Sequence, residues 1–214
     1  MVDVLEQIGI LRIIPVVAID DAADAAPLGE ALLAGGLPIA EITFRTAAAE
    51  ESIRTLAKQS GVLVGAGTVL NLDTAKRAVD AGAKFIVSPG FNPKTVRWCL
   101  DNQVPITPGT ATPTDVEMAL DHGVEVVKFF PAEAIGGLKT LQAISAPYGM
   151  MRFVPTGGIT PDLLEKYLAF PKVLACGGSW MVTKELINDR QFDRITEITK
   201  DAVLRAERAR PSRK

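Results

Sequence analysis

Short apolar segments alternate with longer amphipathic segments from one end of the chain to the other. The short segments lack a strict alternation of apolar and polar residues, which is typical of parallel strands covered on both faces. Eight such strands are predicted, at residues 12–18, 38–43, 62–66, 84–88, 105–107, 125–129, 152–155 and 173–176. Alanine-rich stretches between the strands predict helices, for example at residues 47–59, 72–81 and 115–121.

Several of these helices have recognisable first turns. Asn92, Thr112 and Thr160 each precede a proline, so that a capping side chain stands before proline at the first helical position. Thr112 and Asp115 have the spacing of a capping box, with Asp in place of the longer Glu. Pro27 falls within the first helical stretch, so we expect that helix to be kinked there or regular only beyond it.

The regular succession of strand and helix predicts a single domain over residues 1–214. About eight βα units in this length are the signature of a (β/α)8 TIM barrel. We expect an extra helical segment at the N-terminus and a terminal helix at residues 191–208, followed by a solvated basic tail. A doubly wound open sheet is the alternative, but no Gly-x-Gly-x-x-Gly fingerprint follows the first strand.

Composition narrows the class of protein. The 214 residues are 48% hydrophobic, which suffices for one large core, and the formal net charge of -2 argues against a general nucleic-acid binder. No apolar stretch is long enough to span a bilayer, and the acidic N-terminus lacks the layout of a signal peptide. We therefore expect a soluble, cytoplasmic protein that binds neither nucleic acid nor membrane.

Metal chemistry is not indicated by the residue types. The chain has one histidine, His122, at the end of a predicted helix, and two cysteines, Cys99 and Cys176, far apart in sequence. These are too few and too scattered for a zinc site or a disulfide framework, and we interpret both thiols as buried and inert. We predict no metal and no cofactor, so the chemistry must depend on Lys, Glu, Arg, Thr and backbone groups.

Unusual residues collect at the carboxyl ends of the predicted strands, where barrel enzymes hold their active sites. Lys128 and Glu41 both lie in apolar strands, and charged side chains are rarely buried without a partner. A structural ion pair would satisfy both charges. Arg45 changes this interpretation, because a second cation favours the neutral, nucleophilic form of Lys128 and can bind a substrate carboxylate. Taken singly, Arg45 is better explained as a solvated loop charge.

Two glycine pairs follow the last two strands. Gly157-Gly158 comes after the seventh strand, and Gly177-Gly178 with Ser179 comes after the eighth. Barrels often hold phosphate at this place on backbone N–H groups, and glycine lets the backbone approach closely. Ordinary turns would explain either pair alone. The two pairs in this order indicate a phosphate site.

Segments spread through almost the whole chain resemble the class I aldolases of the 2-keto-3-deoxy-6-phosphogluconate (KDPG) and 4-hydroxy-2-oxoglutarate (KHG) family. They follow one another in the family's order and together make a specific match. The segments are residues 41–46 (EITFRT), 64–70 (VGAGTVL), 87–90 (VSPG), 127–133 (VKFFPAE), 136–137 (GG), 152–159 (RFVPTGGI) and 176–180 (CGGSW). The resemblance implies a homotrimer of barrels that acts on a small-molecule 2-keto acid.

The resemblance also implies a role for individual residues. Lys128 matches the Schiff-base lysine, and Glu41 matches the carboxylate that carries protons. The other matches are substrate-binding positions: Arg45 and Thr68 at the pyruvyl carboxylate, Pro89 and Phe130 along the pocket, Thr156 beside the substrate, and Gly157, Gly158, Gly178 and Ser179 at the phosphate.

Three residues depart from the family pattern. Thr110 stands where a branched apolar residue is expected, Phe44 where leucine is frequent, and Asp115 in place of a more usual Glu. We expect Thr110 to lie near the substrate, where it would alter the substrate range.

These features predict reversible aldol cleavage of KDPG to pyruvate and glyceraldehyde 3-phosphate, with KHG cleavage to pyruvate and glyoxylate as a further activity. A related 2-keto-3-deoxy sugar acid aldolase and a non-catalytic sugar-phosphate-binding barrel remain as alternatives. The intact set of Glu41, Arg45 and Lys128 argues against the non-catalytic barrel. A metal-dependent isomerase or epimerase is disfavoured by the single histidine.

Overall fold

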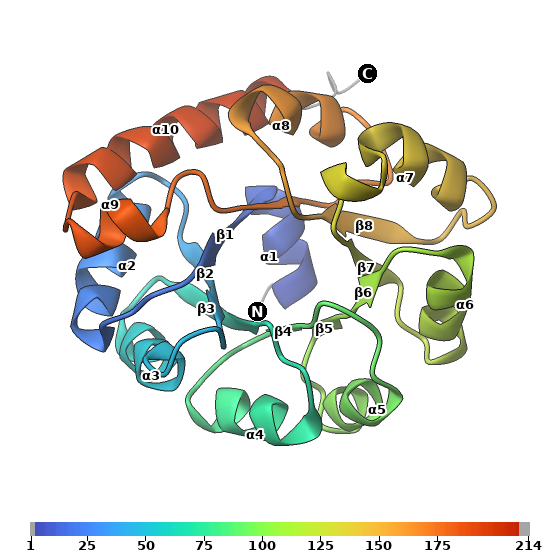
Figure 1. The fold of residues 1–214 in the computed structure, drawn as a ribbon, viewed down its shortest axis with the longest axis horizontal. Coiled ribbons are helices and arrows are strands. Elements are labelled where there is room, and N and C mark those ends of the chain that lie inside the picture. Colours follow the sequence, from blue (N-terminus) through green and yellow to red (C-terminus); the bar gives the residue numbers. More distant parts are fainter. Residues whose placement is uncertain (1–2, 210–214) are drawn as a thin grey trace.

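The computed structural model describes residues 3–209. Parallel strands occupy the centre and helices surround them in a ring (Figure 1). The strands are β1 (Ile13–Val17), β2 (Ile39–Thr43), β3 (Leu63–Gly67), β4 (Ile86–Val87), β5 (Ile106–Thr107), β6 (Gly109–Thr110), β7 (Val126–Phe129), β8 (Arg152–Pro155) and β9 (Cys176–Gly178).

Helices alternate with the strands as the sequence predicts. They are α1 (Val4–Leu11), α2 (Ala25–Ala34), α3 (Ala49–Lys58), α4 (Leu72–Asp80), α5 (Pro93–Asp101), α6 (Pro113–Asp121), α7 (Gly137–Ser145), α8 (Pro161–Leu168), α9 (Lys184–Asn188) and α10 (Phe192–Arg208), with 3-10 turns η1 (Ala22–Asp24) and η2 (Glu133–Ile135). The predicted N-terminal helical segment and terminal helix are therefore both present. The predicted basic tail, residues 210–214, lies outside the described residues.

The strands form two parallel sheets. One sheet has the order β5-β4-β3-β2-β1-β9, and the other has the order β6-β7-β8. Isolated parallel bridges join Phe153 to Val173 and Thr156 to Gly177, so that β8 lies alongside the segment that enters β9. The fold is thus α/β with a curved parallel sheet.

Two predicted strands differ from the observed ones. The strand predicted at residues 105–107 is observed as β5, and a second short strand that was not predicted, β6, follows Pro108, which has no N–H to donate to a ladder. The strand predicted at residues 173–176 lies further along, at Cys176–Gly178. Its last two residues are Gly177 and Gly178, which were predicted to follow the strand as part of a phosphate site. They extend the strand because the absent side chains let neighbouring backbone and side chains approach.

Helix starts mostly follow the predicted caps. The Asn92 side chain accepts hydrogen bonds from the N–H groups of Lys94 and Thr95, and the capping box of Thr112 and Asp115 is confirmed. Thr160 is the N-cap residue and Pro161 begins α8 as predicted, but the Thr160 side chain makes no capping hydrogen bond.

Pro27 is the third residue of α2 and lies within its first turn. The N–H groups of that turn have no acceptor within the helix, so proline costs no hydrogen bond there. The short η1 turn precedes α2 directly, and the helix is regular from Ala25 onward.

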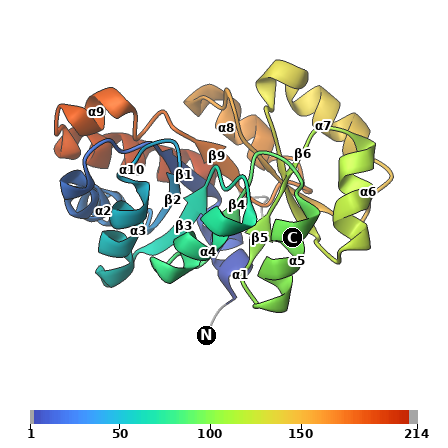
Figure 2. The ribbon, with the colours of Figure 1, turned by 60° about the horizontal axis from the view of Figure 1, so that its bottom comes forward.

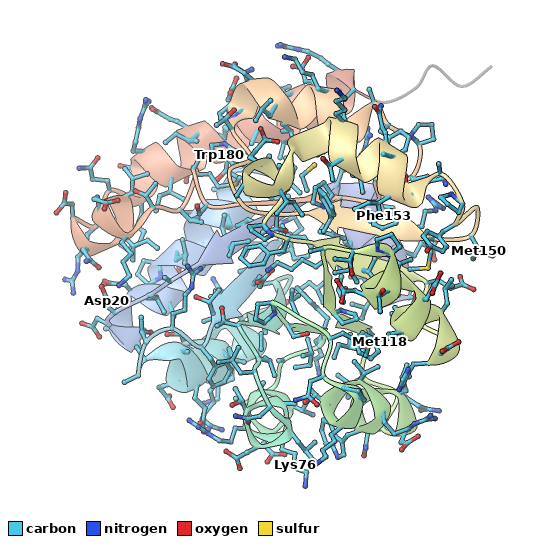
Figure 3. All side chains as sticks on the ribbon, turned by 45° about the vertical axis from the view of Figure 1, so that its right-hand side comes forward. Asp20, Lys76, Met118, Met150, Phe153 and Trp180 are labelled. Atoms are coloured by element: carbon cyan, nitrogen blue, oxygen red, sulfur yellow. The ribbon has the colours of Figure 1, made fainter. Side chains whose placement is uncertain are left out.

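The N-terminal helix α1 lies across the amino ends of the strands, on the opposite side from the carboxyl ends (Figure 2). Ile8 of α1 is buried in the core. Side chains on the inside of the ring, such as Phe153, are buried, whereas Lys76 on α4 points outward from the rim (Figure 3). Among residues 3–209, every helix is too short or too polar to cross a membrane.

Candidate active site

One cavity at the carboxyl ends of the strands contains every residue that the sequence singled out for the site. Its volume is about 280 Å³. The predicted residues on its wall are Glu41, Arg45, Thr68, Pro89, Lys128, Phe130, Thr156, Gly157, Gly158, Gly178 and Ser179. They come from six different strands or the loops that follow them, which explains why they are far apart in sequence.

Lys128 and Glu41 face each other inside this cavity. Lys128 lies on β7 and is 6% exposed, and Glu41 lies on β2 and is 2% exposed. The Lys128 Nζ is 3.8 Å from Glu41 Oε1, which is too long for a hydrogen bond. Glu41 Oε1 has no hydrogen-bond partner among the described residues. A buried ion pair with a purely structural role needs further hydrogen bonds to offset the loss of hydration. Glu41 Oε1 lacks them, so a structural role does not account for this pair.

An aromatic ring covers the amine. The Phe130 ring lies 4.8 Å from the Lys128 Nζ, close enough for a contact between the cation and the ring face. Phe130 directly precedes Pro131, and the peptide bond between them is cis. The side chain of Lys128 therefore ends between an aromatic face and a carboxylate, with the cavity in front of it.

Arg45 and Thr68 line the side of the cavity beyond β2 and β3. The Arg45 Nε donates a hydrogen bond of 3.0 Å to Thr43 Oγ1. Thr68 follows the last residue of β3 and has a φ of 55°. A positive φ is unfavourable for a β-branched residue, and such strain collects at functional sites.

The two glycine pairs meet at one end of the cavity. Gly157 and Gly158 have φ values of 98° and 81°, which glycine adopts without strain. The backbone N–H groups of Gly158 and Ser179 donate no hydrogen bond within residues 3–209. Gly178 lies under the Trp180 ring, since a Cβ there would be only 1.8 Å from a ring carbon. The arrangement offers backbone donors to an anion in an exposed turn.

Thr156 and Pro89 complete the wall. The Thr156 hydroxyl lies 3.4 Å from the backbone oxygen of Val154, and the bare Cα of Gly177 leaves room for it. Pro89 follows β4, in a loop where the Ser88 hydroxyl donates to the backbone oxygen of Gly90 at 2.8 Å.

The three departures from the family pattern lie outside the cavity wall. The Thr110 hydroxyl donates to the backbone oxygen of Lys128 at 3.2 Å, so it faces β7 rather than the cavity, contrary to expectation. Phe44 packs beneath the guanidinium of Arg77 at 5.7 Å. Asp115 accepts the N–H groups of Ala111 and Thr112 as part of the helix cap.

His122 and the cysteines lie away from the cavity wall. His122 ends α6, where its Nδ1 lies 2.8 Å from the Met118 backbone oxygen. Cys99 and Cys176 are buried free thiols, and burial raises the pKa of Cys99 to about 11. Within residues 3–209, no group of three or more His, Cys, Asp or Glu side chains is arranged to hold a metal ion.

The cavity wall includes four residues that the sequence did not single out as site residues: Val16, Thr43, Ile159 and Gly177. The position of Thr43 had a signal, because residues two apart on a strand share a face and Thr43 is two residues beyond Glu41. Gly177 belongs to a glycine pair that was noted, but only its second member was assigned to the site. Val16 and Ile159 have no chemical signal.

Comparison with known proteins agrees with this geometry. The model of the KDPG and KHG aldolase family matches residues 4–198. The chain belongs to the KDPG and KHG aldolase family. A 2-dehydro-3-deoxy-phosphogluconate aldolase of Treponema pallidum is 47% identical over 204 residues, covering 95% of this chain and 97% of that protein. The KHG/KDPG aldolase of Escherichia coli is 41% identical over 192 residues, covering 89% of this chain and 90% of its own.

Solved structures of family members have the same fold. A 2-keto-3-deoxy-6-phosphogluconate aldolase of Zymomonas mobilis superposes with a TM-score of 0.88 at 41% identity, covering 92% of this chain and 95% of that one. A KDPG aldolase of Legionella pneumophila superposes with a TM-score of 0.88 at 37% identity, covering 92% and 96%. In that structure pyruvate was captured as a covalent carbinolamine intermediate.

Proposed function

We propose that this aldolase cleaves KDPG reversibly to pyruvate and glyceraldehyde 3-phosphate through a Schiff base on Lys128. The observation that supports this most directly is the placement of the Lys128 Nζ 3.8 Å from an unpartnered Glu41 oxygen inside a cavity. An amine held beside a carboxylate without a hydrogen bond between them is free to attack a carbonyl. Membership of the KDPG and KHG aldolase family supports the same chemistry.

The cavity has a suitable end for each part of this substrate. Arg45 and Thr68 bind the pyruvyl carboxylate, with the Arg45 guanidinium supplying the charge. Pro89 and Phe130 confine the C2 carbonyl against the amine. At the far end, the N–H groups near Gly158 and Ser179 bind the phosphate. The remaining proposed contacts are Thr156 beside the substrate, and Gly157 and Gly178 at the phosphate turn.

The reaction begins when the Lys128 amine attacks C2 of the 2-keto-4-hydroxy acid. Glu41 protonates the carbinolamine oxygen, water leaves, and an iminium ion forms. Glu41, now ionised, takes the C4 hydroxyl proton directly or through a water molecule. The C3–C4 bond breaks as its electrons move toward the iminium nitrogen, and the aldehyde leaves an enamine behind. Glu41 then protonates C3, and water hydrolyses the resulting imine to pyruvate and free Lys128.

KHG is a second candidate substrate, with pyruvate and glyoxylate as products. The name of the E. coli relative covers both substrates, and so does that of a structure from TTHB1 at 35% identity. Cleavage of KHG would use the same lysine and carboxylate. It would leave the glycine-rich end of the cavity without a phosphate.

We also propose that the two parallel sheets together form one closed (β/α)8 barrel. β5 and β6 are halves of one strand interrupted at Pro108, and each belongs to a different sheet. The bridge between Thr156 and Gly177 joins the other edges of the two sheets. Counting β5 and β6 as one strand leaves eight in the ring.

Two further proposals are a homotrimer, which the family resemblance supports, and a cytoplasmic location, which the composition of the chain supports. Light scattering coupled to size-exclusion chromatography tests the first, since a trimer of this 22.8 kDa chain would have about three times that mass. Cell fractionation tests the second. A stable monomer, or a protein recovered with membranes, would contradict the corresponding proposal.

Borohydride trapping with pyruvate tests the Schiff base. We expect the intact mass to rise by one reduced pyruvyl adduct, on the peptide that contains Lys128. Lys128→Ala should give no adduct, and Glu41→Gln should keep the fold but lose about 10²–10⁴-fold in turnover. An adduct of equal yield in Lys128→Ala would overturn the assignment. An adduct without cleavage of KDPG or KHG would favour the non-catalytic barrel or a related sugar-acid aldolase.

A further inference from the structure

Thr43 ends β2 and points into the same cavity as Glu41. The two side chains share a face of the strand because they are two residues apart. Thr43 is buried, with 1% of its surface exposed. A buried hydroxyl needs hydrogen-bond partners, and the identity of these partners determines what Thr43 does.

The Thr43 hydroxyl stands in the middle of a chain of two hydrogen bonds. It donates to the Val17 backbone oxygen at 2.6 Å and accepts from the Arg45 Nε at 3.0 Å. The direction of this chain is determined by chemistry, because a carbonyl oxygen only accepts and a guanidinium only donates. The single hydroxyl proton is therefore committed to Val17, and an oxygen lone pair faces Arg45.

Arg45 itself lies beyond the strand and its residue surface is exposed. An exposed arginine samples many rotamers, and holding one of them costs conformational entropy. The Thr43 hydroxyl holds the guanidinium at Nε. Within residues 3–209, the Nη1 and Nη2 groups of Arg45 make no hydrogen bond or ion pair, so these donors remain available to a ligand.

The loop around Arg45 is tied to the end of β1 a second time. The Thr46 hydroxyl donates to the backbone oxygen of Ile19. Together, the hydroxyls of Thr43 and Thr46 attach both flanks of Arg45 to one neighbouring segment. Thr43 differs from Thr46 because only Thr43 also contacts the guanidinium.

We propose that Thr43 is a positioning residue that presents the Nη1 and Nη2 edge of Arg45 to the substrate carboxylate. This inference rests on the proposed function, since it requires a 2-keto acid in the cavity. It assigns Thr43 no contact with the reacting carbon. Loss of the hydroxyl should therefore weaken recognition of the carboxylate and leave the reactivity of Lys128 unchanged.

The test compares pyruvate with pyruvamide, which has the same ketone but a neutral amide in place of the carboxylate. The measured quantity is the half-saturating concentration of each ligand in borohydride inactivation. Thr43→Val removes the hydroxyl at constant shape, and Thr43→Ser keeps it. We expect Thr43→Val to raise the half-saturating concentration of pyruvate by about tenfold, as for loss of a hydrogen bond to a charged group. The half-saturating concentration of pyruvamide should stay within about twofold of the wild-type value. Thr43→Ser should behave as the wild type with both ligands.

Three outcomes separate the possibilities. The proposal for Thr43 would be overturned if Thr43→Val changed the half-saturating concentrations of both ligands equally, or left that of pyruvate unchanged. If Arg45→Met raises the half-saturating concentrations of pyruvate and pyruvamide by equal factors, then Arg45 does not bind the carboxylate and the proposal also fails. Absence of any adduct in the wild type would instead contradict the Schiff-base function. If Thr43→Val does not fold, Thr43→Ala provides the same comparison with a smaller side chain.

Discussion

Gly67 leaves the space that the Glu41 carboxylate occupies. A Cβ at Gly67 would lie 2.1 Å from Glu41 Oε1, far inside van der Waals contact. Gly67 is the last residue of β3, the strand next to the one that carries Glu41. The position of the Glu41 carboxylate thus depends on the absence of a side chain at Gly67.

Gly67→Ala should therefore displace Glu41 and slow catalysis. The obstructing atom is the end of a flexible side chain, so we expect the protein to fold with the carboxylate turned away. Because general acid–base catalysis contributes about 10²–10⁴-fold, kcat should fall by about 10²-fold. Steady-state kinetics with KDPG and a thermal melt provide the measurement. Gly149→Ala is the matched control, since a Cβ there meets nothing within 4 Å, and normal kcat in Gly67→Ala would contradict the argument.

The interaction between Lys128 and Glu41 should also contribute to the free energy of unfolding. Lys128→Met would leave the Glu41 carboxylate buried without its cation, and breaking a buried pair in this way costs about 3–5 kcal/mol. Lys128→Met combined with Glu41→Gln removes both charges and should be less destabilised than the sum of the two single variants. Urea unfolding of the four proteins gives the coupling energy, which we expect to exceed about 1 kcal/mol. Additive effects would mean that the two charges do not interact.

Buried thiols should make the fold sensitive to alkaline pH. Burial raises the pKa of Cys99 from 9.0 to about 11, so between these values the folded protein holds a proton that the unfolded chain has lost. Stability from this group is complete below about pH 9 and is lost as the pH rises toward 11. We expect the free energy of unfolding to fall over this range, and to fall less steeply in Cys99→Ala. Identical slopes for the two proteins would contradict this. Burial also raises the pKa of Cys176. Part of the pH dependence of the free energy of unfolding should therefore remain in Cys99→Ala.

The buried pair of Lys128 and Glu41 could be found from the sequence because a charge in an apolar strand is conspicuous. Lys128 and Glu41 stand out against neighbours that are buried on both sides, and the carboxyl ends of parallel strands share one side of the fold. Thr43 was missed as a site residue because threonine is an ordinary strand residue. Its importance comes from the direction of two hydrogen bonds, which spacing along the chain does not specify.

Strand boundaries were less predictable than the order of elements. The strand predicted at residues 105–107 ends before Pro108, as the missing N–H of proline leads one to expect, but the short strand β6 beyond Pro108 was not predicted. The shift of the last strand to Cys176–Gly178 was not predictable in the same way, because a glycine pair is typical of a turn. The contacts of Gly177 with Thr156 and of Gly178 with Trp180 exist only once the chain has folded.

The contact between Gly178 and Trp180 gives a test of the phosphate end. A Cβ at Gly178 would lie 1.8 Å from the Trp180 ring, so Gly178→Ala must move the ring or the turn that includes Ser179. We expect KM for KDPG to rise by about tenfold, as for loss of hydrogen bonds to a charged group, and KM for KHG by less than about threefold. Kinetics with both substrates check this, with Gly149→Ala as control. Equal rises in the two KM values would show that phosphate is not bound there.

Thr68 has a strained backbone and also lines the cavity, next to the proposed site of the substrate carboxylate. Its φ of 55° costs about 1–3 kcal/mol for a side chain other than glycine. Thr68→Gly removes that strain but gives the unfolded chain about 0.5–1 kcal/mol more conformational freedom, so we expect a net gain of about 1 kcal/mol in stability. The same change should raise KM, because the side chain that lines the cavity is lost. Gln103→Gly is the matched control: Gln103 is exposed, has a φ of 57° and lies outside the cavity wall. It should gain similar stability with KM unchanged, and a Thr68→Gly variant that is more stable at normal KM would remove Thr68 from substrate binding.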